Sequence, residues 1–264
     1  MLRQRIITAL ILAALVLGAI FWLPEDITAA VITLLVLAGA WEWAAFTGLK
    51  HALGRIAYVL LIAGCIAFVW SHGTSSPRAE QLLSAALIWW VVALVWVATM
   101  PSVGNRGSAA LAGILVLVPA WLALIRLHQL APYWLLFLLL LVVATDVGAY
   151  FAGRKFGRHK LAPKVSPGKT WEGVLGGLAA AAVTAAIGTA WFKVDIAAFI
   201  AVCAVVVAAS VVGDLTESLF KRHAGLKDSG TILPGHGGVL DRVDSVTAAA
   251  PIFVLGLDWL GLLR

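Results

Sequence analysis

Apolar runs of about 20 residues recur along almost the whole chain, and no other feature of the sequence restricts its fold so strongly. A helix of that length spans the hydrocarbon core of a bilayer. The composition agrees, because 62% of the 264 residues are apolar and only 12% are charged. A typical soluble domain carries about 25% charged residues. The sequence therefore predicts an all-α, polytopic bundle of transmembrane helices.

Nine spans are predicted, and Pro24, Pro101 and Pro132 interrupt the apolar pattern between several of them. Their expected ranges are 6–23, 27–47, 54–71, 82–100, 108–126, 133–153, 171–192, 196–220 and 245–263. With the N-terminus in the cytoplasm and the C-terminus outside, fifteen of the 19 lysines and arginines lie on the cytoplasmic side. This distribution follows the positive-inside rule. The cations form no long basic arm, so the net charge of +6 does not indicate nucleic-acid binding.

The most charged segment of the chain runs from 218 to 244 and reads SLFKRHAGLKDSGTILPGHGGVLDRVD. Charged side chains beside the hydrocarbon region are costly and usually serve a function. Lysine and arginine bind phosphate, aspartates ligate hard divalent cations, and glycines let backbone N–H groups approach an anion. The candidates here are Ser218, Lys221, Arg222, Lys227, Asp228, His236, Gly237, Gly238, Asp241, Arg242 and Asp244. The pattern suits a site for a polyphosphate and its metal ions.

The helix before this segment carries a polar stripe. Asp214, Glu217, Ser218 and Lys221 are spaced so that they share one helical face. Such a stripe is expected to face the bundle interior or a wet cavity. An internal ion pair between Glu217 and Lys221 is an alternative for those two residues, but it leaves Asp214 without a local partner. For His236, the alternative is a histidine satisfied by the loop backbone.

A second polar cluster comprises Asp146, Arg154, Ser166, Lys169, Thr170 and Glu172. Asp146 lies deep in an apolar helix, where a lone carboxylate is expensive, so a metal or cationic partner is expected. The stretch SPGKT is no Walker loop, because Pro163 occupies the position of the required glycine. Lys169 and Thr170 nevertheless precede a predicted helix, whose N-terminus favours anions. Contact of Arg154 and its neighbours with anionic lipid headgroups is the alternative. Glu42, between two tryptophans, shows no spacing that indicates a site.

The segment 218–244 closely resembles the signature of the phosphatidate cytidylyltransferases, or CDP-diacylglycerol synthases. In that signature S-x-x-K-R is followed by K-D and then by H-G-G-x-x-D-R-x-D, and this chain fills it without gaps. The upstream segments D-x-x-A-Y-F-x-G-R, from Asp146, and S-P-x-K-T-x-E-G, from Ser166, are also similar to this family. The resemblance covers the C-terminal half. It divides the chain into residues 1–130, with spans one to five, and a catalytic half, 131–264, with spans six to nine and cytosolic loops 154–170 and 221–244.

The resemblance implies the reaction CTP + phosphatidate → CDP-diacylglycerol + pyrophosphate, with Mg²⁺ as the divalent metal. On this interpretation the metal ligands are Asp146, Asp214, Asp241 and Asp244. The expected catalytic residues are Lys221, Arg222, Lys227, Asp228, His236 and Arg242, of which His236 binds substrate rather than serving as a base. The expected substrate-binding residues are Arg154, Ser166, Lys169, Thr170, Glu172, Ser218, Gly237 and Gly238.

Two other functions remain open at this stage. A CTP-dependent kinase of polyprenols such as dolichol would use a similar membrane site, but would release CDP. An anion or lipid transporter would bury the same charges along a pathway, although the sequence shows no clear repeat. We expect an integral protein of the bacterial inner membrane with its active site on the cytoplasmic face. A homodimer is compatible with the sequence, which does not determine the oligomeric state.

Overall fold

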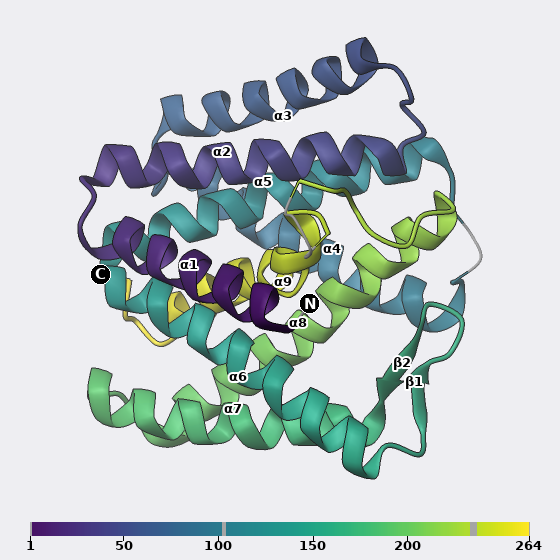
Figure 1. Ribbon diagram of the computed structural model, residues 1–264. Helices are drawn as coiled ribbons and strands as arrows, with labels where there is room; N and C mark the ends of the chain where they lie inside the picture. Colours follow the sequence, from purple (N-terminus) through teal and green to yellow (C-terminus); the bar gives the residue numbers. More distant parts are fainter. Residues whose placement is uncertain (1, 102–103, 233–236, 264) are drawn as a thin grey trace.

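Nine helices and one β-hairpin make up the part of the chain that the computed structural model describes, which is residues 2–101, 104–232 and 237–263 (Figure 1). In chain order they are α1 (Leu2–Phe21), α2 (Glu25–Phe46), α3 (Ala52–His72), α4 (Pro77–Thr99), α5 (Arg106–Leu130), α6 (Pro132–Phe156), β1 (Lys160–Ala162), β2 (Ser166–Thr170), α7 (Trp171–Phe192), α8 (Ile196–His223) and α9 (Leu240–Trp259).

The predicted class, a polytopic helical membrane protein, is confirmed. Seven helices, α2 to α8, are long and apolar enough to cross a membrane. The apolar part of α1 is shorter, from Ile11 to Phe21, and α9 does not meet the same criteria. Large apolar side chains on the outside are freely exposed, for example Leu60, Ile88 and Ile187 at 64%, 66% and 65%. That is the surface a bilayer requires. Nine crossings, N-terminus in and C-terminus out, stay a prediction.

The interior of the bundle is built around α5 and α9. Every residue of α9 from Ser245 to Val254 is buried, including Pro251 and the polar Thr247. Aromatic rings from α6, α8 and α9 itself meet here, where Trp134, Phe137, Phe199 and Phe253 contact one another. The helix that begins at the charged signature segment is therefore enclosed by the other helices rather than by lipid.

Helices α6 and α7 pack against each other with their backbones almost in contact. A side chain at Gly148 would place its Cβ 2.6 Å from the carbonyl oxygen of Gly176, so only glycine fits there. Small residues commonly permit this close approach between membrane helices. The antiparallel hairpin β1–β2 connects the two helices, with Lys160 opposite Thr170. The sequence predicted only a loop at this connection, because its polar residues show no strand-like alternation.

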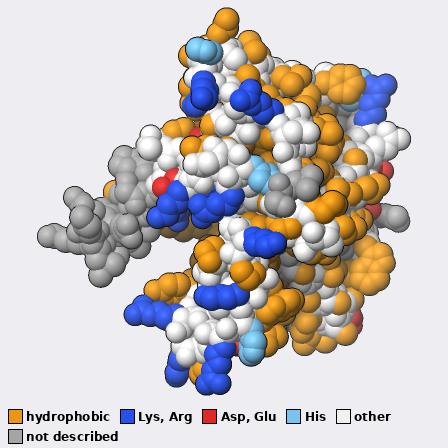
Figure 2. Space-filling model, turned by 90° about the vertical axis from the view of Figure 1, so that its right-hand side faces the viewer, with side chains coloured by type: hydrophobic (Ala, Val, Ile, Leu, Met, Phe, Trp, Pro, Cys, Tyr) orange, Lys and Arg blue, Asp and Glu red, His pale blue; other side chains and the backbone are white. Residues whose placement is uncertain are grey.

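Both predicted polar clusters lie at one end of the bundle, which we call the polar face. It carries the hairpin, the C-terminal end of α8 and the N-terminal end of α9 (Figure 1). The end of α4 belongs to it too, because His223 Nε2 lies 2.9 Å from the carbonyl oxygen of Pro101. Figure 2 shows lysine and arginine side chains gathered over this face. The turn between α3 and α4 therefore lies at the opposite end, one full helix length away.

Candidate active site

A cavity of about 470 Å³ opens between α6, α7 and α8 at the polar face. Asp146 and Arg154 of α6, Lys169 and Thr170 of β2, and Asp214 of α8 all line it. Lys169 Nζ lies 2.7 Å from Asp214 Oδ2, and both side chains keep about a quarter of their surface exposed. The two polar stretches of the sequence, far apart along the chain, therefore meet in one cavity.

The hairpin is fixed at its base by hydrogen bonds. Thr170 Oγ1 caps α7 by accepting from the N–H of Gly173 at 3.1 Å. Glu172 accepts from the N–H of Arg158 at 3.1 Å and contacts Nδ1 of His159 at 2.7 Å. Glu172 and Ser166 do not line the cavity. The contacts of Glu172 hold the base of the hairpin that carries Lys169, and the predicted part of Glu172 and Ser166 in substrate binding stays a prediction.

Behind the cavity, acidic side chains continue inward along α8 and α9. The Asp214 carboxylate lies within electrostatic range of Asp146 on one side and of Asp244 on the other. Lys221 Nζ lies 2.7 Å from Asp241 Oδ1 and 3.1 Å from Glu217 Oε1. The side chains of Lys221 and Asp241 are only 10% and 9% exposed. The Glu217–Lys221 ion pair, which the sequence left open as an alternative, is therefore present. Lys221 also pairs with Asp241 of α9.

Asp241 joins the two ends of the signature loop. Its Oδ2 accepts hydrogen bonds from the N–H and the hydroxyl of Ser229 and from the N–H of Gly238, each at 2.9 Å. Burial raises the pKa of the Asp241 carboxyl. The hydrogen bonds from Lys221, Gly238 and Ser229 outweigh burial and hold that pKa below its ordinary value. Asp241 thus anchors the loop in this structure, and its predicted role as a metal ligand stays a prediction.

Glu42, on α2 in the N-terminal half, is a site-forming residue that the sequence analysis missed. Its side chain is 2% exposed and accepts hydrogen bonds from the N–H of Val239 at 3.0 Å and of Leu240 at 2.9 Å. It also accepts from Ser229 Oγ at 3.1 Å. A carboxylate here satisfies orphan N–H groups at the start of α9 and complements the positive end of that helix. A lone acid in an apolar run was the only sequence signal.

The glycines of the signature serve this tight packing. A side chain at Gly238 would clash with Ser229 Oγ and place its Cβ 2.6 Å from Glu42 Oε1. Gly237 has a φ of +83°, in the region that favours glycine. Both residues therefore shape the loop, and the backbone N–H of Gly238 donates to Asp241.

The remaining signature residues lie at the end of α8, in the loop after it and at the start of α9, a part of the polar face that we call the rim. Arg222, Lys227, Asp228 and Arg242 are exposed to solvent. Ser218 Oγ lies 3.3 Å from Asp214 Oδ1. His236 lies outside the described residues. The rim thus offers exposed cationic side chains at the polar face, onto which the mixed-charge cavity also opens.

The carboxylates around the cavity are of the kind that a divalent metal ion binds. Among the described residues, no three His, Cys, Asp or Glu side chains form a ready cage. Mg²⁺ does not require one, because it binds through one or two carboxylates together with water and substrate phosphate. Five carboxylates (Asp146, Asp214, Glu217, Asp241, Asp244) face three cations (Arg154, Lys169, Lys221) around the cavity and its inner wall. This excess of negative charge fits a divalent cation.

The fold and the cavity define an integral membrane protein with a mixed-charge polar site, and comparison with known proteins specifies the family. The cytidylyltransferase family model matches residues 3–260. The chain belongs to this family, as its signature predicted, and is therefore an enzyme of the nucleotidyltransferase class.

Relatives with assigned activities agree. The chain is 46% identical over 262 residues to a phosphatidate cytidylyltransferase of Pseudomonas aeruginosa, covering 96% of each chain. It is 42% identical over 281 residues to the phosphatidate cytidylyltransferase of Haemophilus influenzae, covering 96% of this chain and 97% of the relative. A phosphatidate cytidylyltransferase of Brucella melitensis is 34% identical over 287 residues, and the match covers 96% of this chain and 92% of the relative.

Proposed function

We propose that this protein transfers the cytidylyl group of CTP to phosphatidate, giving CDP-diacylglycerol and pyrophosphate for phospholipid synthesis. Its family and the activities named for its relatives support this choice of substrates. The observation that carries the proposal is the cavity where Lys169 and Asp214 meet beside Asp146, within a membrane bundle and at its polar face. A water-soluble nucleotide reaches this place from the polar face, and a lipid reaches it from the bilayer.

The chemistry joins two anions. An oxygen of the phosphatidate phosphate attacks the α-phosphorus of CTP, and a new P–O–P linkage forms. The bond from the α-phosphorus to the oxygen that bridges to the β-phosphate breaks, and pyrophosphate leaves with that oxygen. A phosphate monoester is already ionised at pH 7, so the step needs no strong general base. Charge neutralisation and positioning supply most of the rate in such transfers.

The cations divide between the cavity and its rim. Lys169 and Arg154 line the cavity and would contact the reacting phosphates. Arg222, Lys227 and Arg242 lie exposed at the rim, where they would hold the triphosphate and the departing pyrophosphate. Lys221 is engaged by Asp241 and Glu217, so it would act chiefly by holding the loop in place.

Asp146, Asp214 and Asp244 are the residues that would hold Mg²⁺, since both carboxylate oxygens of Asp241 already accept protein donors. When bound, the ion would neutralise phosphate charge and make the α-phosphorus more electrophilic. Without substrate, the carboxylate of Asp214 is balanced by its ion pair with Lys169. Asp214 would exchange its pairing with Lys169 as the nucleotide enters, which frees the lysine for phosphate.

We place the active site on the cytoplasmic face of a bacterial inner membrane. CTP is a cytosolic nucleotide, and the relatives with named activities are bacterial. The clustering of lysine and arginine on the polar face also agrees with the positive-inside rule. Accessibility of Lys227→Cys to an impermeant thiol reagent from one side of sealed vesicles tests this orientation.

Product identity tests the reaction. Purified protein is incubated with phosphatidate, Mg²⁺ and CTP labelled at either the α- or the γ-phosphate. The proposal requires the α-label in a liponucleotide and the γ-label in pyrophosphate. Transfer of the γ-label to a lipid would show a kinase instead. The absence of labelled lipid with either form of labelled CTP would exclude the proposed reaction.

A further inference from the structure

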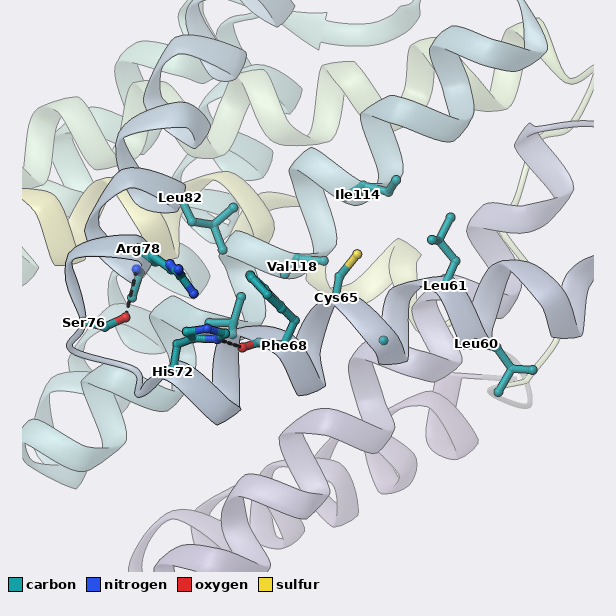
Figure 3. A pocket seen from close by; sticks show the side chains of 13 residues that line it. Leu60, Leu61, Cys65, Phe68, His72, Ser76, Arg78, Leu82, Ile114 and Val118 are labelled. Atoms are coloured by element: carbon teal, nitrogen blue, oxygen red, sulfur yellow. Dashed lines mark hydrogen bonds between the residues drawn. The ribbon is translucent and has the colours of Figure 1, made fainter.

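A second cavity, of about 550 Å³, lies between α3, α4 and α5, away from the candidate active site. Its walls are mostly apolar and include Leu60, Leu61 and Phe68 of α3, Leu82 of α4 and Val118 of α5 (Figure 3). Ser76 and Arg78 lie at one end of this groove, next to His72. The Nδ1 atom of His72 lies 2.8 Å from the carbonyl oxygen of Phe68.

The groove belongs to the end of the bundle opposite the polar face. Arg78 lies in the first turn of α4, whereas the other end of that helix leads to Pro101, which contacts His223 of α8 at the polar face. A helix of this length traverses the hydrocarbon core, about 30 Å thick. Lipids of the leaflet opposite the catalytic cavity therefore reach this groove.

We propose that this groove binds an anionic glycerophospholipid, with one acyl chain along α3 and the headgroup phosphate on Arg78. The distance along α3 from His72 to Leu60 is about 18 Å at the helical rise per residue. One leaflet contributes about 15 Å of hydrocarbon. The apolar length therefore matches one acyl chain entered from the membrane surface.

The charge at the end of the groove selects the headgroup. The Arg78 guanidinium lies 5.8 Å from the centre of the Phe68 ring and forms no ion pair with any residue in the described ranges. An arginine at this level of a bilayer binds phosphate through two parallel hydrogen bonds, and a zwitterionic headgroup offsets part of that attraction with its own cation. The cationic end and the apolar length together fit an anionic lipid better than a second copy of the chain.

The chain offers a substitution that blocks the groove without a clash. A Cβ at Gly64, on the groove wall, would meet no atom within 4 Å. Gly64→Leu therefore fills the groove, and leucine also favours the helix more than glycine does. Gly18 of α1 is a matched control, since its Cβ position is equally open and it does not line the groove. Lys193, exposed at the same end of the bundle with a φ of +56°, is the charge control as Lys193→Asn.

The experiment is native mass spectrometry of the purified protein with phosphatidylglycerol or phosphatidylcholine of identical acyl chains. The expected result is one retained phosphatidylglycerol, bound about tenfold more tightly than phosphatidylcholine, which corresponds to about 1.4 kcal/mol. Arg78→Gln is expected to remove this preference, and Gly64→Leu to lower retention of both lipids at least tenfold. Gly18→Leu and Lys193→Asn are expected to behave as the unchanged protein.

Three results would overturn the proposal. Equal losses in Arg78→Gln and Lys193→Asn would show that only surface charge matters. Unchanged lipid retention in Gly64→Leu would show that no acyl chain occupies the groove. A change from dimer to monomer mass in Gly64→Leu would show that another copy of the chain occupies it. Cytidylyl transfer measured in parallel keeps this test separate from the catalytic proposal, because the groove variants are expected to retain it.

Discussion

Replacing Glu42 with glutamine preserves the size of a buried side chain but removes its charge and one hydrogen-bond acceptor. In the structure, both carboxylate oxygens accept: Oε1 from Val239 N–H at 3.0 Å, and Oε2 from Leu240 N–H at 2.9 Å and Ser229 Oγ at 3.1 Å. A glutamine NH₂ group in the second position would face a backbone N–H, so donor would meet donor.

The magnitude follows from these contacts. A hydrogen bond to a charged group contributes about 1.5–3 kcal/mol, and a buried donor left unpaired costs about 1–3 kcal/mol. We therefore expect Glu42→Gln to weaken docking of the signature loop by about 2 kcal/mol, which lowers the ratio of docked to undocked loop about 30-fold. The effect is expected mainly on turnover, because the loop positions Asp241 and the rim cations over the cavity.

The assay is steady-state CDP-diacylglycerol formation, together with proteolysis at the loop. The matched control is Glu25→Gln, which makes the same change at the exposed first turn of the same helix. Turnover of Glu42→Gln is expected to fall at least tenfold and loop cleavage to accelerate, while Glu25→Gln leaves both unchanged. Full activity of Glu42→Gln with an equally protected loop would refute the anchoring role.

Three further outcomes are expected. Asp241→Asn is expected to abolish turnover in a protein that stays folded and membrane-inserted, because the loop loses the pairing with Lys221; retained activity would contradict this. Lys227→Ala is expected to raise the apparent KM for CTP severalfold, since it removes one phosphate contact at the rim, and an unchanged KM would argue against its placement. Chelation of divalent cations is expected to stop the reaction and Mg²⁺ to restore it, and activity that persists after chelation would exclude the metal role of the aspartates.

The class of fold was predictable because apolar span length leaves few alternatives, but the contacts within the site depend on distances across the chain. Asp146 and Asp214 were identified as acidic residues on apolar helices, and Lys169 as a cation just before a predicted helix. The structure places all three in one cavity. The sequence also indicated Glu217–Lys221, because these residues stand one helical turn apart. It gave no indication that Asp241, twenty positions further along, takes the same lysine.

Glu42 shows most clearly which contacts cannot be predicted from the sequence. It lies 197 positions before the N–H of Val239 that it binds, and no local periodicity relates the two. The signature residues Gly237 and Gly238 were interpreted as an anion-binding turn, although their packing against Ser229 and Glu42 serves the loop itself. A tight loop and a phosphate cradle require the same residue type for different reasons, so sequence alone could not separate them.

The most direct test of the account compares two lysines of one hairpin. Lys169 lines the cavity and pairs with Asp214, whereas Lys164 is exposed in the turn before β2 and does not line it. If the cavity is where CTP reacts, kcat/KM for cytidylyl transfer falls about 100-fold in Lys169→Ala, as for loss of one preorganised charge contact. In Lys164→Ala it stays within about twofold, as expected for a surface change. Equal values in the two variants would contradict the assignment of this cavity as the active site.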